Sequence, residues 1–136
     1  MRFQEKSLAY ALLRIAMGVN LAGHGLIRLL VVGLGQFAHG SADRLAKSPL
    51  PPTLVLGFLY VVPIVEAVVG IAMVFGVMTR TALVTASLLM IALTIGVTSN
   101  QQWDAAGTQL LYSLVLFVLL LFVEHNEISV DRQLRR

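Results

Sequence analysis

The hydrophobic positions of the chain form four long runs separated by short polar connections. The runs cover residues 8–35, 53–77, 81–99 and 107–123. About 20 consecutive apolar residues carry a helix through the hydrocarbon layer of a bilayer, where a helix keeps its backbone hydrogen bonds internal. The pattern therefore predicts an all-α integral membrane four-helix bundle, formed as a single domain over residues 1–136.

The connection between the first two runs is longer and more mixed than the others. Residues 36–53 combine polar and apolar positions and end in Ser-Pro-Leu-Pro-Pro. Proline cannot continue a helix and favours an extended backbone before it. A short interfacial helix followed by a rigid elbow fits this stretch. A lid or docking surface is one interpretation of its role, and a plain surface connection is the favoured one.

Polar side chains form a stripe along the first run. Tyr10, Arg14, Asn20, His24 and Arg28 fall within an arc of about 120° at helical spacing. Each Arg near the centre of a span costs roughly 2.5–3.5 kcal/mol on insertion scales, so it needs a partner or a function. The stripe therefore predicts a helix whose polar side faces other parts of the protein.

Small residues lie beside this stripe at seven-residue intervals. Ala11, Gly18 and Gly25 repeat in this way, and small residues let a neighbouring helix backbone approach closely in a membrane. The first helix is thus predicted to be a packed interior helix.

Glu66 is the only charged residue in the second run and lies near its middle. At about 1.5 Å per residue, His24 lies within roughly one turn of the same depth. We expect His24 to be its first partner, with Arg14 and Arg28 reaching in from either side. This group either binds a polar headgroup or carries a proton, or it is an ion pair that only fixes helix register; the functional interpretation is favoured.

Further polar residues gather in the half of the bundle opposite the chain ends, between Leu-, Val-, Met- and Phe-rich walls. Pro63, Gly25 and Gly70 are expected to leave room for a gap there. Apolar walls with a few convergent polar groups are typical of a small-molecule site. The candidate ligand-binding residues are Arg14, His24, Arg28, Tyr60, Glu66 and Tyr112.

Composition supports a membrane location. The chain is 57% hydrophobic and 12% charged, with a mean hydropathy of +0.84, which excludes an ordinary soluble domain. There is no cysteine, so thiol chemistry and thiolate metal sites are excluded within this chain. His24, His39 and His125 form no spaced ligand pair, and we expect no metal site.

The basic residues indicate topology rather than nucleic-acid binding. The net charge is +3, but Lys and Arg concentrate at the chain ends and in one short turn. By the positive-inside rule, this distribution predicts a multi-pass protein of the cell inner membrane with both termini cytoplasmic. Membrane lipids, and a larger membrane protein complex or further copies of the chain, are the expected partners.

Several short motifs resemble those of the DoxX-like membrane proteins. They are Arg14-Ile-Ala-Met-Gly18, His24-Gly25-Leu-Ile-Arg28, Pro63 with Glu66 and Gly70, Gly76-Val-Met-Thr79-Arg80, and Ile128-Ser-Val-Asp131-Arg132. The resemblance implies a four-helix bundle related to membrane subunits of thiosulfate:quinone oxidoreductase. It also implies a polar intramembrane site at Arg14, His24 and Glu66.

Three functions remain open. The leading hypothesis is a quinone-interacting membrane subunit of a redox-associated complex, with quinone as the candidate cofactor and an outward-opening polar site. Such a chain is at most a non-autonomous subunit of a quinone-linked oxidoreductase, and no catalytic residue is assigned. The alternatives are a structural or assembly subunit that anchors a partner complex, and a small transporter or proton path.

Overall fold

The computed structural model describes residues 3–134 and shows a helical membrane bundle, with no strand among those residues. Four helical stretches are long and apolar enough to cross a membrane, which confirms the predicted fold class. The helices are α1 (Phe3–Ile27), π-helix η1 (Arg28–Gly33), α2 (Leu34–Arg44), α3 (Pro52–Phe75), α4 (Thr79–Ser99), α5 (Trp103–Leu121), 3₁₀ turn η2 (Val123–His125) and α6 (Val130–Gln133).

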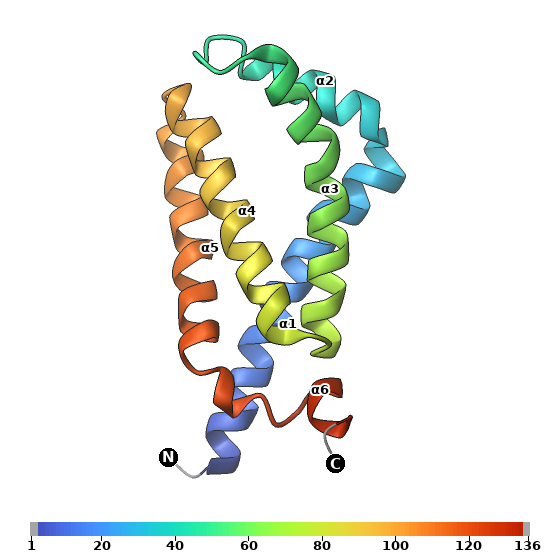
Figure 1. The fold of residues 1–136 in the computed structure, drawn as a ribbon, viewed down its shortest axis with the longest axis vertical. Coiled ribbons are helices and arrows are strands. Elements are labelled where there is room, and N and C mark those ends of the chain that lie inside the picture. Colours follow the sequence, from blue (N-terminus) through green and yellow to red (C-terminus); the bar gives the residue numbers. More distant parts are fainter. Residues whose placement is uncertain (1–2, 135–136) are drawn as a thin grey trace.

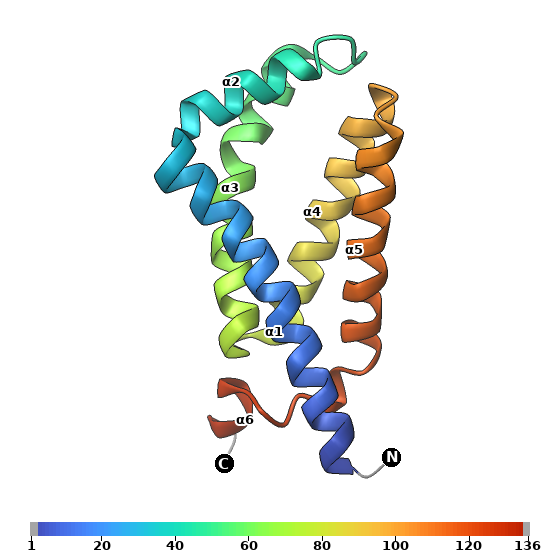
Figure 2. The same cartoon turned by 180° about the vertical axis from the view of Figure 1, so that it is seen from behind.

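The helices form two pairs that diverge from one end of the bundle. Helix α1 crosses closely against α3, and α4 runs beside α5, while the two pairs separate toward the end that carries α2 (Figures 1 and 2). The N- and C-terminal ends of the described chain both lie at the opposite end (Figure 1). We call this the inner end and the α2 end the outer end, following the predicted orientation.

Small residues explain the close contact of α1 with α3. A Cβ added at Gly18 would meet the backbone of Gly70 and Val74, and one added at Gly25 would collide with the backbone of Pro63 and Ala67. The predicted small-residue contact is therefore confirmed, with α3 as its partner. The prediction that Gly25 and Gly70 leave a gap is wrong, because the space they free is filled by helix backbone.

The main apolar core occupies the region where all four spans converge. Its most deeply buried members include Leu21, Met73, Leu83, Leu116 and Leu119, one or more from each spanning helix. In a membrane these residues stabilise the fold by close packing rather than by removal from water. Because the core lies toward the inner end, the diverging outer half is left free for a site.

The outer end is covered by α2, which confirms the predicted short helix. The backbone changes direction at Gly33, whose φ of +87° is readily adopted by glycine. Ala38 of α2 then packs against Val55 and Leu59 of α3 in a second apolar cluster. Pro51 and Pro52 begin α3, where proline is well tolerated because the first helical N–H has no intrahelical acceptor.

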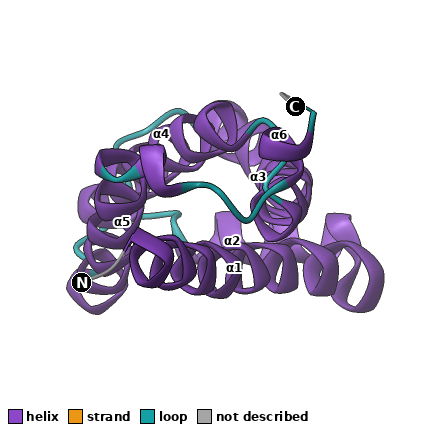
Figure 3. Ribbon diagram, turned by 90° about the horizontal axis from the view of Figure 1, so that it is seen from below, coloured by secondary structure: helices purple, strands orange, loops and turns teal. Residues whose placement is uncertain are grey.

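The C-terminal segment closes the inner end of the bundle (Figure 3). The Asp131 carboxylate accepts hydrogen bonds of 2.7 Å from the backbone N–H groups of both Met78 and Thr79. These donors belong to the first turn of α4 and have no acceptor within the helix, so the carboxylate acts as a cap.

Candidate functional site

The centre of the candidate site is an ion pair between Arg28 and Glu66. Glu66 is only 3% exposed and points from the middle of α3 toward the first helix, as predicted. The Arg28 side chain is 26% exposed, and its guanidinium carbon lies 4.6 Å from the centroid of the Phe37 ring on α2. Glu66 and Phe37 therefore hold the guanidinium from two sides and leave part of it accessible.

This ion pair borders a cavity of about 530 Å³ between the diverging helices. A cavity of this size falls within the usual range for small-molecule sites. Most of its wall is apolar, contributed by α3 and α4. The wall includes Leu54, Phe58, Val62, Ala92, Leu93 and Ile95.

Gln109 brings an unpaired acceptor to the cavity from α5. Its side-chain oxygen Oε1 is buried and has no hydrogen-bond partner among the described residues, although Gln109 lines the cavity. By contrast, the Thr94 and Thr98 hydroxyls each donate to a carbonyl of their own helix. A buried acceptor without a donor costs about 1–3 kcal/mol, so Gln109 is the group most in need of a ligand here.

Polar contacts close the outer end above the cavity. The Ser48 and Ser99 hydroxyl oxygens lie 2.7 Å apart, and the Asn100 side chain donates to the Arg44 carbonyl at 2.8 Å. These bonds join the end of α2 and the connection after it to the end of α4 and the turn after it. We call them the outer latch.

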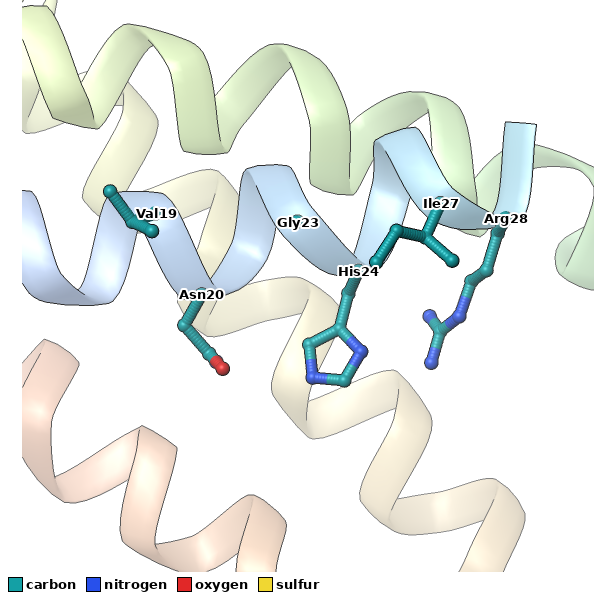
Figure 4. A pocket seen from close by; sticks show the side chains of 6 residues that line it. All are labelled: Val19, Asn20, Gly23, His24, Ile27 and Arg28. Atoms are coloured by element: carbon teal, nitrogen blue, oxygen red, sulfur yellow. The ribbon is translucent and has the colours of Figure 1, made fainter. Parts of the chain in front are cut away.

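The structure corrects the predicted role of His24. His24 does not pair with Glu66; Arg28, one turn farther along the same helix face, takes that position. His24 projects with Asn20 and Arg28 from one side of α1 (Figure 4) and is exposed. The Arg28 guanidinium, not the His24 imidazole, therefore faces the Glu66 carboxylate.

Arg14 also lies elsewhere than predicted. It is 2% exposed and donates a hydrogen bond to the Asn126 side-chain oxygen at the inner end. Asn126 in turn donates to the Thr79 hydroxyl at 2.9 Å. Arg14 therefore joins α1 to the C-terminal segment and does not line the cavity.

The two predicted tyrosines lie beside the cavity rather than in its wall. The Tyr60 ring meets His39 edge to face, with 6.1 Å between ring centroids, and Tyr112 packs against the main core. Phe37 and Gln109 belong to the site but are not among the candidate residues predicted from the sequence. Gln109 was visible as a polar residue in the outer half, whereas the position of Phe37 depends on the fold of α2 over the site.

Comparison with known proteins places the chain in a membrane family. The sequence model of the methylamine utilisation protein MauE matches residues 6–108, about three quarters of the chain. The chain belongs to the MauE family. The matched region includes Arg28 and Glu66 and ends just before Gln109.

The match refines the resemblance seen in the motifs. The matched family is MauE rather than the DoxX-like proteins, so the confirmed part of that expectation is membership in a family of multi-pass membrane proteins. No curated protein and no solved structure gives a significant match.

Proposed function

We propose that this MauE-family chain is a membrane subunit of a redox enzyme system and that its outer cavity binds a quinone. The observation that carries the proposal is the combination of a largely apolar cavity of about 530 Å³ with polar groups at its edge, among them Arg28, Glu66 and Gln109. The apolar wall suits the tail of a lipid, and the polar groups suit its head.

The hydrogen-bonding chemistry of these groups fits a quinone. A quinone head offers two carbonyl acceptors, and its reduced form offers two hydroxyl donors. The partly exposed Arg28 guanidinium has N–H groups for a carbonyl oxygen, while the orphaned Gln109 oxygen would accept from a hydroxyl. Glu66 holds Arg28 in place and balances its charge. When bound, the quinone would supply a carrier for two electrons and two protons in the membrane.

The family name supports the redox part of the proposal. Releasing the carbon of methylamine as formaldehyde removes two electrons, so its utilisation by that route needs an electron acceptor. This chain has no cysteine and so offers no dithiol for the purpose. A membrane subunit that holds a lipid-soluble acceptor near an oxidising partner would fit such a system.

The test is quinone binding by purified protein in lipid nanodiscs, with wild type compared with Gln109→Leu. Loss of one hydrogen bond to the ligand is expected to weaken ubiquinone or menaquinone binding about tenfold. Because Oε1 has no protein partner, the ligand-free variant should be at least as stable as wild type. Gln133→Leu, an exposed position on α6 at the other end of the bundle, is the matched control.

Two results would count against the proposal. One is the absence of saturable quinone binding by the wild-type protein, and the other is equal binding by Gln109→Leu and Gln133→Leu. Either result would favour an assembly subunit whose polar groups only pack the helices.

A further inference from the structure

One face of α1 at mid-membrane depth carries two polar side chains, Asn20 and His24, that have no hydrogen-bond partner among the described residues. A hollow of about 310 Å³ lies on this face, and all of its lining residues come from α1 and the first residue of η1. They are Val19, Asn20, Gly23, His24, Ile27 and Arg28, which Figure 4 shows in two rows along the helix. We call this the α1 face.

The depth of this face follows from its neighbours. Gly25 packs against the backbone of Pro63 and Ala67, which lie in the middle of the membrane-spanning helix α3. His24 is therefore at mid-membrane, and it is exposed. A polar side chain that faces hydrocarbon at this depth is costly, so such residues normally find a partner.

The partner is absent from the chain itself. Within residues 3–134, the His24 side chain makes no hydrogen bond or ion pair, and the Asn20 amide nitrogen is buried without an acceptor. The buried nitrogen lies out of reach of another molecule, so Asn20 presents its side-chain oxygen at the surface (Figure 4).

We propose that the α1 face binds the same face of a second copy of this chain. Copies inserted in the same orientation and related by a two-fold axis along the membrane normal place each residue at the same depth in both. The facing groups must then be self-complementary. The Asn20 oxygen is an acceptor, and neutral His has both a donor and an acceptor, so His24 of one copy can donate to Asn20 of the other.

The shape of the face suits close helix contact. Gly23 lies between Asn20 and His24, and a Cβ added there would meet nothing within 4 Å. Among the described residues, no other helix of this chain packs against Gly23, so the absence of a side chain there leaves space for a helix backbone of another molecule. Val19 and Ile27, four residues to either side, supply apolar contact above and below it. The exposed apolar side chains of α4 and α5 offer Asn20 no hydrogen bond; they include Leu88, Ile91, Leu110, Leu114 and Phe117.

Dimerisation would also cover part of the candidate site. Arg28 lines both the α1 face and the outer cavity, so the second copy would shield its exposed edge from lipid. The inference does not depend on the ligand, because the association can be measured without any quinone.

The test uses Gly23→Cys in the full-length chain, which has no native cysteine. Oxidation in membranes is expected to give a covalent dimer. Gly57→Cys on α3 is the matched control, because a Cβ added at Gly57, like one at Gly23, would meet nothing within 4 Å, and it should stay monomeric on the gel. Asn20→Leu combined with His24→Leu should weaken dimerisation in vesicles, measured by single-molecule photobleaching, by about tenfold or more.

Three results would overturn the inference. The first is a wild-type chain that remains monomeric at every density in vesicles, with no cross-link through Gly23→Cys. The second is equal cross-linking by Gly23→Cys and Gly57→Cys. The third is a cross-link through Gly23→Cys to a different polypeptide only, which would assign the α1 face to the transmembrane helix of another subunit.

Discussion

Arg28 and Glu66 differ in how deeply they are buried, so we expect their mutations to lower the stability of the folded protein by different amounts. Arg28 can extend toward the interface when its partner is lost, whereas Glu66, at 3% exposure, would remain a buried carboxylate without a cation. Arg28→Leu should therefore destabilise the folded protein by about 3 kcal/mol or more, and Glu66→Leu by less. The double variant should be more stable than Arg28→Leu alone, as measured by unfolding in detergent.

The same measurement separates Arg28 from the partner predicted by sequence. His24→Leu and Glu66→Leu should couple more weakly than Arg28→Leu and Glu66→Leu, because Glu66 forms its ion pair with Arg28 and not with His24. A coupling between His24 and Glu66 as large as that between Arg28 and Glu66 would contradict the observed pairing.

At the inner end, we expect a methyl group added at Gly76 to destabilise the folded protein. Its φ is +69°, and a Cβ there would press on the Arg14 guanidinium and the Cβ of Ser129. Gly76→Ala should lower the free energy of unfolding by about 1–3 kcal/mol. Gly40→Ala is the control, because it lies in α2 with free space and should be neutral or stabilising. Equal melting temperatures for the two variants would contradict this account.

At the scale of elements, the outer latch joins the two halves of the divergent bundle. The Ser48 and Ser99 hydroxyl oxygens are 2.7 Å apart, so a disulfide is expected to form when both are replaced by cysteine. Closing the intervening loop should raise stability by about 2–4 kcal/mol, measured by thermal unfolding with and without reductant. A stability gain that persists after reduction would show that the cross-link is not its cause.

At the scale of the whole molecule, the charge distribution predicts the orientation of the bundle. Among the described residues, Lys6, Arg80 and Arg132 lie on the inner side and Arg44 and Lys47 on the outer side. The sequence adds Arg2, Arg135 and Arg136 at its two ends. By the positive-inside rule, we expect the inner end to face the cytoplasm. Ala46→Cys at the outer end should react with an impermeant thiol reagent added to intact cells, whereas Gln133→Cys should react only after lysis. The reverse pattern would invert the topology.

The sequence alone determined the features that depend on local pattern and on the membrane itself. Hydrocarbon requires long apolar helices, so the four spans could be located to within a few residues at most boundaries. The small-residue spacing of Gly18 and Gly25 predicted a close helix contact, and the cost of a buried carboxylate predicted that Glu66 faces the first helix. Each of these follows from residues near one another in the chain.

Only the tertiary structure decided which polar groups meet. Arg14 and Asn126 are 112 residues apart, and no periodicity relates them. Depth arithmetic placed His24 beside Glu66, but the rotation of α1 fixed by its glycine contacts with α3 brings Arg28 to the carboxylate instead. The cavity exists because the two helix pairs diverge above a core at the inner end, and the crossing geometry that sets this divergence comes from packing across the whole bundle.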